Sequence, residues 1–161
     1  MKNALPCTLP CTLPCINTTP LPCTGGRLRK LTRRMTSFYE QRLRTIGLKL
    51  SQYSVLMNIS MEPQSLLQLA ARLEMDRTTL TRSLKPLVEC GWVAEAPADD
   101  ARQRLLVLTL SGQRFRKRAQ RVWVEAQSAL ETQLGRDFVV TLNAQLEIAL
   151  SQLKPGLPQE N

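Results

Sequence analysis

Histidine is missing from this sequence of 161 residues. Histidine is the side chain that most often serves as a general base or as a metal ligand, and its absence excludes Ser-His-Asp and Cys-His catalysis. No other pairing of a nucleophile with a base, and no glycine-rich loop that would hold phosphates, is visible. The sequence therefore predicts a protein that is not an enzyme and that has no cofactor and no metal site.

Long apolar runs are also missing. No run approaches the roughly 20 residues that a membrane-spanning helix needs. The first 23 residues carry a proline every few positions and no continuous apolar stretch, which is unlike a secretory signal. We therefore expect a cytoplasmic protein in which the 5 cysteines are reduced thiols rather than disulfides.

Acidic residues are scarce: the sequence has 13 Asp and Glu against 22 Lys and Arg, for a formal net charge of +9. This excess predicts an anionic partner, either nucleic acid or an acidic membrane surface. The charge is unevenly placed, because residues 26–49 carry eight basic side chains and one acid, whereas residues 125–161 carry two and five. The length and a hydrophobic content of 43% fit one globular domain with a real core.

The first 24 residues repeat the unit Leu-Pro-Cys, which begins at residues 5, 9, 13 and 21. Prolines at this density forbid a helix or an interior strand, so we expect residues 1–26 to form an extended or disordered tail that Gly25 and Gly26 separate from the folded part. Soft thiolates could take up Cu(I) or Zn(II), but Cys7, Cys11 and Cys15 are four residues apart, unlike a zinc knuckle. An inert tail and a redox role for its thiols stay open as alternatives.

The chain from Arg27 onward has a helical pattern. Apolar residues recur at steps of three and four and are opposed by a basic face. This predicts a first helix that ends at Gly47, a second over residues 52–61, and a third that Ser65 opens with a capping box. The apolar side chains of the first helix are Leu28, Leu31, Met35, Phe38 and Tyr39.

A helix rich in Thr and Arg follows, capped by Asp76 and ended by Gly91. Small polar and Arg side chains on its leading turns are suited to reading base edges in a major groove. Residues 93–109 then predict two short strands joined by a basic loop, and such a hairpin can reach the neighbouring minor groove. Pro86 removes a hydrogen bond to the carbonyl of Arg82, so we expect a kink beyond the DNA-facing turns. This pairing predicts a DNA-binding regulator, with double-stranded DNA as its partner and no membrane contact.

The candidate DNA contacts of this helix are Arg77, Thr78, Thr79, Thr81 and Arg82, and those of the loop are Asp100, Arg102 and Arg104. Arg can bind a guanine edge through two hydrogen bonds, and Thr can contact a phosphate or a thymine methyl group. We expect Arg102 to reach the minor groove or a phosphate, oriented by Asp100. For the basic residues between positions 114 and 121, a phosphate contact and a solvated helix face both stay open. The predicted buried residues of the helix are Leu80, Leu84, Leu87, Val88 and Cys90.

Two more helices are predicted, over residues 110–134 and 137–153, each with an apolar stripe. The terminal helices are more apolar than a small winged helix requires, so we expect a homodimer with two recognition helices roughly 34 Å apart on a pseudo-palindrome. The predicted fold is mainly α with a small β-hairpin wing. Its parts are a tail (1–26), an N-terminal dimerisation helix (27–50), a winged helix-turn-helix (51–110), C-terminal dimerisation helices (111–154) and a second tail (155–161).

Four short motifs follow one another in the order of a known family. They are Leu69-Ala-Ala-Arg-Leu73, Cys90-Gly-Trp-Val93, Asp100-Ala-Arg102 and Leu108-Thr-Leu-Ser-Gly112. Over residues 27–153 the sequence resembles the MarR family of bacterial winged-helix repressors, and the most specific match is the Asp-x-Arg wing followed by Leu-Thr-x-x-Gly. The resemblance implies an obligate dimer that represses transcription and releases DNA on binding a small molecule or on thiol oxidation.

The resemblance also directs attention to an effector and to a thiol. A pocket for a small aromatic or phenolic effector would be lined by Met35, Tyr39, Tyr53 and Met57, for which core packing is the alternative. Cys23 lies close to Arg27 and Arg29, and positive charge favours the reactive thiolate form of a cysteine. Peroxide-sensing members of the family carry a reactive cysteine near the first helix, so Cys23 is the redox candidate. A thiol or metal sensor that acts through the tail and a non-specific chromosome-binding protein are the two rival functions.

Overall fold

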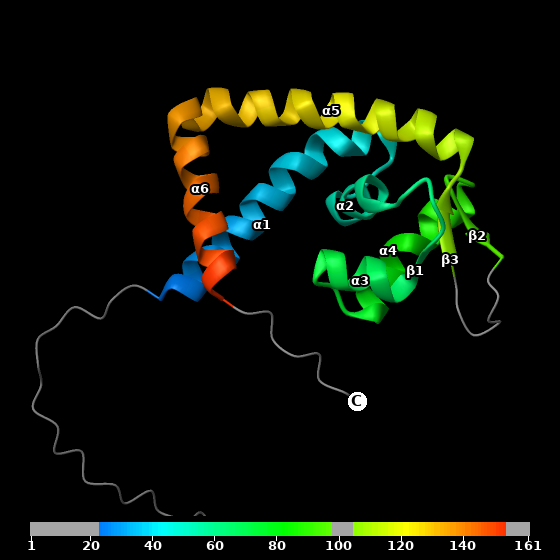
Figure 1. Ribbon diagram of the computed structural model, residues 1–161. Coiled ribbons are helices and arrows are strands. Elements are labelled where there is room, and N and C mark those ends of the chain that lie inside the picture. Colours follow the sequence, from blue (N-terminus) through cyan, green and yellow to red (C-terminus); the bar gives the residue numbers. More distant parts are fainter. Residues whose placement is uncertain (1–22, 98–104, 154–161) are drawn as a thin grey trace, which may run out of the picture.

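The computed structural model describes residues 23–97 and 105–153, and Figure 1 shows their arrangement. In chain order the elements are α1 (Thr24–Leu43), the 3-10 helix η1 (Arg44–Ile46), α2 (Leu50–Asn58), β1 (Gln64–Ser65), α3 (Leu66–Leu73), α4 (Arg77–Glu89), β2 (Val93–Ala96), β3 (Leu105–Leu108), α5 (Leu110–Leu134) and α6 (Arg136–Gln152). The fold is mainly α-helical with one small sheet, as predicted. The predictions for residues 1–22, 98–104 and 154–161 lie outside the described residues.

The helices form two parts that α5 connects (Figure 1). We call α2, α3, α4, the sheet and the N-terminal half of α5 the head, and we call α1, α6 and the C-terminal half of α5 the arm. α1 and α6 both pack against α5, whereas α4 packs against α2, α3 and β2. Within residues 23–97 and 105–153, no helix has both the length and the apolar character that crossing a bilayer requires.

The head surrounds a core of apolar side chains that are shielded from solvent. α2, α3 and α4 contribute Leu56, Leu69 and Leu80, each with 0% of its surface exposed. Leu43 and Leu48, on either side of η1, extend this core toward the arm. Burial of one such side chain stabilises the fold by about 1.5–3 kcal/mol, so the core fixes how the three helices lie relative to one another.

Three short antiparallel strands form a sheet in the order β1-β3-β2. Val93 of β2 pairs with Leu108 of β3, and both side chains are buried. The sequence predicted β2 and β3, and the structure confirms both strands. It did not predict β1, which pairs with Leu105 and Leu106 of β3, because two residues are too few to show an alternating pattern.

α1 begins at Thr24 rather than at Arg27, and it therefore includes Gly25 and Gly26. Cys23 is its N-cap residue, and its Sγ atom accepts a hydrogen bond from the backbone N–H of Gly26 at 3.3 Å. This contact satisfies a donor of the first turn that has no partner within the helix. The expectation that the two glycines separate the tail from the first helix is therefore wrong.

α2 is shorter than predicted, because it ends at Asn58 instead of near residue 61. Nη1 of Arg72 in α3 donates a hydrogen bond to the carbonyl of Asn58 at 3.1 Å. Nη1 of Arg116 in α5 donates to the carbonyl of Ile59, also at 3.1 Å. The two guanidinium groups satisfy carbonyls that the helix leaves without partners, and their positive charge suits the negative end of the helix dipole.

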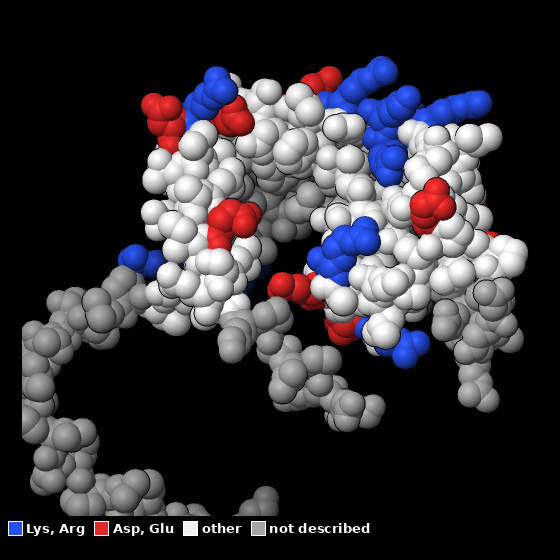
Figure 2. All heavy atoms as spheres, in the orientation of Figure 1, with Lys and Arg blue, Asp and Glu red and all other residues white. Residues whose placement is uncertain are grey.

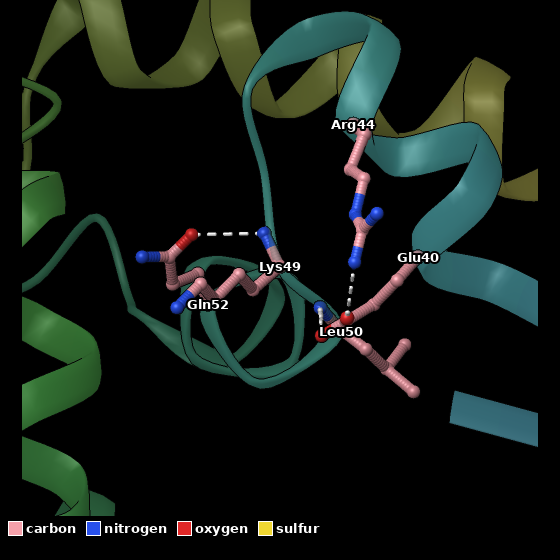
Figure 3. Close-up of polar contacts among 5 residues, drawn as sticks. All are labelled: Glu40, Arg44, Lys49, Leu50 and Gln52. Carbon is pink, nitrogen blue, oxygen red and sulfur yellow. Dashed lines mark hydrogen bonds and ion pairs between the residues drawn. The ribbon is translucent and has the colours of Figure 1, made fainter. Parts of the chain in front are cut away.

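A group of polar contacts joins α1 to α2 (Figure 3). One carboxylate oxygen of Glu40 accepts a hydrogen bond from the backbone N–H of Leu50, the first residue of α2, at 3.4 Å. Its other carboxylate oxygen lies 3.9 Å from Nη2 of Arg44. Oε1 of Gln52 accepts from the backbone N–H of Lys49 at 2.8 Å. The negative charge of Glu40 thus lies at the positive end of the α2 dipole and connects the arm to the head.

Two residues at the end of α4 were predicted to be buried but are exposed. Val88 is 39% exposed, and Cys90 is exposed as well. Val88 lies about 100° around the helix from Leu87, so it points away from the side that faces the core. Gly91, with a φ of 69°, then turns the chain toward β2. α4 continues through Pro86 to its end, so this proline does not stop the helix, and the kink stays a prediction.

Candidate nucleic-acid interface

The start of α4 is fixed by Asp76. Its Oδ1 atom accepts a hydrogen bond from the backbone N–H of Thr79 at 2.8 Å, and its Oδ2 atom accepts one from the Thr79 hydroxyl at 2.6 Å. These bonds, the side-chain bond first, hold the pKa of Asp76 below its ordinary value. The carboxylate therefore stays charged at the N-terminus of the helix, where negative charge is favourable. The predicted cap is confirmed.

α4 has one buried and one exposed side. The buried side consists of Leu80, Ser83, Leu84 and Leu87. On the other side, Thr78, Arg82 and Lys85 follow one another at steps of four and three residues, and all three are exposed. α4 therefore presents a row of polar and cationic side chains to the solvent.

Lys85 is not among the contacts that the sequence pointed to. Lys85 lies seven residues, or two helical turns, after Thr78, so both residues share one side of the helix. This spacing could have predicted Lys85 from the sequence. Its Nζ atom lies 3.9 Å from Oε1 of Glu89, with side-chain exposures of 76% and 62%. An ion pair as exposed as this one contributes little, so Lys85 can exchange Glu89 for another anion.

The five predicted contacts of α4 are all exposed, but they differ in what their polar groups already bind. The hydroxyl of Thr79 donates to the N-cap carboxylate, and that of Thr81 donates to the carbonyl of Arg77 at 2.7 Å. Among the residues that the structure describes, the side chains of Arg77, Thr78 and Arg82 form no hydrogen bond or ion pair. These three side chains are therefore free to bind a ligand, whereas the other two threonines offer methyl groups and oxygen lone pairs.

A network of hydrogen bonds connects the end of α4 to the start of α5. Thr109 is the N-cap residue of α5, and its hydroxyl oxygen accepts from the backbone N–H of Gly112 at 2.9 Å. The same hydroxyl donates to the carbonyl of Gly91 at 2.7 Å, and the hydroxyl of Ser111 donates to that carbonyl at 2.8 Å. The Leu-Thr-x-x-Gly motif therefore positions the ends of the two strands that carry the loop.

The loop between β2 and β3 contains three of the predicted contacts. Asp100, Arg102 and Arg104 lie outside the described residues, so their contacts stay predictions. The pair of strand residues next to the loop is Ala96 of β2 and Leu105 of β3. At the other end of the strands, the ring of Trp92 stacks on that of Phe115 with centroids 3.5 Å apart. The strand pairing thus fixes the two points between which the loop runs.

The basic residues at the start of α5 are of two kinds. Arg116 is half-buried and donates to the end of α2, so its role is structural. The others are exposed: Arg114, Lys117, Arg118 and Arg121. Figure 2 shows Lys and Arg side chains gathered over this part of α5, on the side of the head away from α4. These residues do not extend the exposed row of α4.

Two of the predicted effector residues lie against the same ring. The rings of Tyr39 in α1 and Tyr53 in α2 are stacked on Trp123 of α5, with centroid distances of 6.4 Å and 6.1 Å. The hydroxyl of Tyr39 donates to Oε1 of Gln127 at 2.5 Å. Burial raises the pKa of Tyr53 to about 12, and burial followed by the charge of Glu131 raises that of Tyr39. Both phenols are therefore neutral at physiological pH.

The other two predicted effector residues are methionines. Met57 packs partly buried against the core, and Met35 is half-buried on α1. Trp123 was not predicted to belong to this site, because nothing in the sequence of a single helix shows that its ring stacks with two tyrosines from other helices. Binding of an effector at this meeting point of arm and head stays a prediction.

A cavity of about 240 Å³ lies elsewhere, between α4 and the sheet. It is lined by Leu66, Thr81, Leu84, Lys85, Val88, Glu89, Glu95 and Leu106. None of the four predicted effector residues lines this cavity. Its walls instead include Lys85, which belongs to the exposed row of α4.

The described cysteines, Cys23 and Cys90, are free and exposed. In the described part of the chain, no three Cys, Asp or Glu side chains come close enough together to hold a metal ion. Cys7, Cys11 and Cys15 fall in residues 1–22, outside the described ranges. The redox role of Cys23 is untested by these observations and stays a prediction.

The arrangement of α4, the sheet and α5 is similar to that of known proteins. Residues 46–103, which include most of the head, match the sequence profile of the MarR family. The structure is similar to that of a mutant MarR from E. coli in complex with operator DNA. The two share 26% sequence identity and a TM-score of 0.69, over 78% of this chain and 92% of that chain. Over most of the head, the chain is therefore similar in sequence to the MarR family, and over 78% of its length it is similar in structure to MarR.

Two further proteins are similar to this chain. M. tuberculosis MosR in complex with DNA is 29% identical, with a TM-score of 0.62 over 80% of this chain and 98% of that chain. The HTH-type transcriptional regulator YwoH of Bacillus subtilis (strain 168) is 36% identical over 70 residues. That match covers 43% of this chain and 51% of YwoH, about half of its length. The resemblance inferred from the four motifs, and the winged-helix fold that it implied, are confirmed.

Proposed function

We propose that this protein is a MarR-family, sequence-specific DNA-binding transcriptional regulator that acts as a dimeric repressor. The observation that carries the proposal is the exposed row of Thr78, Arg82 and Lys85 on α4, opposite the side that packs on the core. A helix with such a row fits a major groove, where base edges present distinct hydrogen-bond patterns. The solved complexes of MarR and MosR with DNA support the same conclusion.

The residues of α4 have different proposed roles. Arg77 and Arg82 are the base readers, because a free guanidinium can bind O6 and N7 of guanine together. In Thr79 and Thr81 the hydroxyl hydrogen is already donated, so we assign their methyl groups to contacts with thymine methyl groups. Lys85, at the end of the exposed row, binds a phosphate.

The loop between β2 and β3 supplies the remaining proposed contacts. Arg102 and Arg104 bind phosphates or the minor groove, and Asp100 orients Arg102. The proposal is supported by the pairing of Ala96 with Leu105 next to the loop, and by Trp92 and Thr109, which tie the other ends of β2 and β3 to the start of α5.

The arm supports dimer formation. Large apolar side chains of α6 are exposed, at 56% for Phe138, 59% for Val140, 50% for Ile148 and 61% for Leu150. They lie on more than one side of the helix, and a helix that is apolar all round is normally buried. A second copy that packs its own arm here would cover these side chains and set the two α4 helices roughly 34 Å apart.

Release from DNA is the regulatory part of the proposal. A small aromatic or phenolic effector would bind where Tyr39, Trp123 and Tyr53 stack, because these rings come from α1, α5 and α2 and so join the arm to the head. A ligand that separates the rings would change the distance between the two α4 helices of a dimer. Oxidation of Cys23 is the second route, supported by the exposure of its thiol at the start of α1.

The proposal is tested by measuring the Kd of the full chain for a duplex selected from genomic DNA and for a shuffled duplex of the same composition. Both measurements use the same near-physiological salt concentration. A regulator should prefer the selected duplex by a factor of about 10³ or more. Equal affinity would identify a non-specific chromosome-binding protein instead. Deletion of residues 1–22 tests the sensor alternative, because unchanged binding and release would dismiss it.

A further inference from the structure

α5 carries a row of cations on its outer side. Arg114, Lys117, Arg118 and Arg121 follow the spacing i, i+3, i+4 and i+7, so they share one face of the helix, and all four are exposed. We call these four residues the α5 stripe. The side of α5 that faces the head and the arm is formed instead by small or apolar residues: Gly112, Phe115, Ala119 and Ala126.

Nothing in the described structure neutralises the α5 stripe. Among residues 23–97 and 105–153, the ion pairs within 4.0 Å are Glu40–Arg44 and Lys85–Glu89, neither of which involves α5. The first turn of α5 contains no acid, and its acids, Glu125 and Glu131, come in the C-terminal half. This distribution is the reverse of the one that the helix dipole favours. The stability of α5 therefore does not account for the stripe.

The α5 stripe and the exposed row of α4 face in different directions. α4 packs against α2, α3 and β2, whereas α5 packs against α1, α2 and α6, so that α2 lies between them. In Figure 1 α5 crosses the top of the molecule and α4 lies below it, and Figure 2 shows basic side chains along that upper edge. A duplex held by α4 therefore leaves the stripe uncovered.

We infer that the α5 stripe binds the phosphate backbone of a second DNA duplex while α4 binds the first. Four cations spread over about 10 Å of helix axis match the close spacing of phosphates along a duplex. This function goes beyond the proposed regulator, which needs only α4 and the loop for its DNA contacts. It makes the protein a bridge between two DNA segments.

The surroundings of the stripe favour DNA over a lipid surface. A helix that lies on a membrane inserts an apolar side into the headgroup region. The apolar side of α5 is already occupied, because Ala119 and Ala126 are fully buried. The outer side of α5 carries the four cations, and its exposed large apolar side chains, Leu110 and Val124, lie one at each end of the stripe rather than forming a continuous apolar side.

A two-duplex capture assay with the full chain tests the inference. One duplex, selected from genomic DNA by the wild-type protein, is fixed to beads, and retention of a second, fluorescent duplex of random sequence is measured. The stripe variant replaces all four cations: Arg114→Gln, Lys117→Gln, Arg118→Gln and Arg121→Gln. The control variant removes the same charge from exposed residues of α1: Arg29→Gln, Lys30→Gln, Arg33→Gln and Arg34→Gln. Gln is a good helix former, and circular dichroism verifies that both variants fold. Because α1 belongs to the arm, sedimentation velocity also verifies that both variants keep the oligomeric state of the wild-type protein.

The wild-type protein and the control variant should retain the second duplex. The stripe variant should bind the first duplex with a Kd within twofold of that of the wild-type protein. It should retain at least tenfold less of the second duplex than the wild-type protein does. The salt dependence of retention, as the slope of log K against log salt, should become shallower by about 3 to 4, because each phosphate contact contributes about 0.9.

Other results would overturn the inference. Full retention by the stripe variant would mean that two α4 helices of a dimer hold the two duplexes. An equal loss in the control variant would mean that only net charge matters, and an equal loss of first-duplex binding would place the stripe in the α4 interface. Stripe-dependent capture of phosphatidylserine vesicles or of polyglutamate, without capture of DNA, would assign the surface to a membrane or to an acidic protein. If no genomic duplex is preferred, the proposed regulator fails, and the stripe is still tested on random duplex alone.

Discussion

Gly112 lies directly against the backbone of Trp92. A Cβ atom added at Gly112 would lie 2.8 Å from the carbonyl carbon of Trp92 and closer still to its oxygen. The same carbonyl accepts a hydrogen bond from the backbone N–H of Thr109 at 3.1 Å. The start of α5 therefore packs closely against the turn that follows α4. This close packing explains why the Leu-Thr-x-x-Gly motif has a glycine at position 112.

Gly112→Ala should destabilise the protein, because the new methyl group would clash with backbone atoms of Trp92, which cannot move away by a change of rotamer. We expect a loss of unfolding free energy near the upper end of the ~1–3 kcal/mol that overpacking costs, measured by urea denaturation. Gly25→Ala is the matched control, since Gly25 also lies in a first helical turn and has no atom within 4 Å of an added Cβ. Equal stability of the two variants would contradict the close packing.

Arg82→Ala should weaken binding to the selected duplex by about 1–3 kcal/mol and leave binding to random DNA almost unchanged. The reason is that a base-reading side chain contributes only where its base is present. Lys85→Ala, on the same exposed row, should weaken binding to both duplexes equally, because a phosphate contact is independent of sequence. Fluorescence anisotropy at fixed salt measures both effects. An equal loss for Arg82→Ala on the two duplexes would remove it from the base readers.

Replacing Phe138 and Leu150 together by Glu should break the proposed dimer. Each protomer contributes two of these side chains, and each is only about 60% exposed, so burying it in the interface contributes about 1–2 kcal/mol. Losing all four should raise the dimer Kd by a factor on the order of 10²–10⁵. Sedimentation velocity over a range of protein concentrations measures the change. The control replaces Leu67 and Leu110 of the head, which are 70% and 73% exposed, by Glu. If only the control variant dissociates, the interface lies on the head instead of on α6. If neither variant dissociates, the proposed interface is ruled out.

Tyr53 should make stability depend on pH in the alkaline range. Burial raises its pKa from 10.0 to about 12, so the fold disfavours the phenolate. The contribution of the neutral phenol is complete below pH 10 and is lost as pH rises from 10 to about 12. Compared with Tyr53→Phe, the wild-type protein should lose unfolding free energy over this interval. Parallel pH profiles of the two proteins would show that Tyr53 titrates normally in the fold.

The parts of the fold that depend on neighbours in the sequence were predictable. α5 spans residues 110–134 as its pattern predicted, because the cap at its start and the glycine after its end are local signals. The caps Ser65 and Asp76 act within three residues of themselves, and the structure confirms both. The winged-helix class followed from such signals, because they set the order and length of the elements.

The parts that depend on distant residues were not predictable. The carbonyl of Ile59, just after the end of α2, binds Arg116, which is 57 residues away along the chain. The stacking of Tyr39 and Tyr53 on Trp123 likewise needs three helices in place. The α5 stripe could be read from the sequence as a cluster of charge, but its direction relative to α4 could not.

The central claim, that α4 of a dimer reads a defined DNA sequence, is tested most directly by affinity selection and sequencing of genomic fragments on the reduced full chain at near-physiological salt. The account predicts recovery of one inverted repeat with half-sites about one helical turn apart, and loss of this enrichment with the Arg82→Ala variant. Recovery of fragments that share no motif, or the same motif enrichment with the variant, would contradict it.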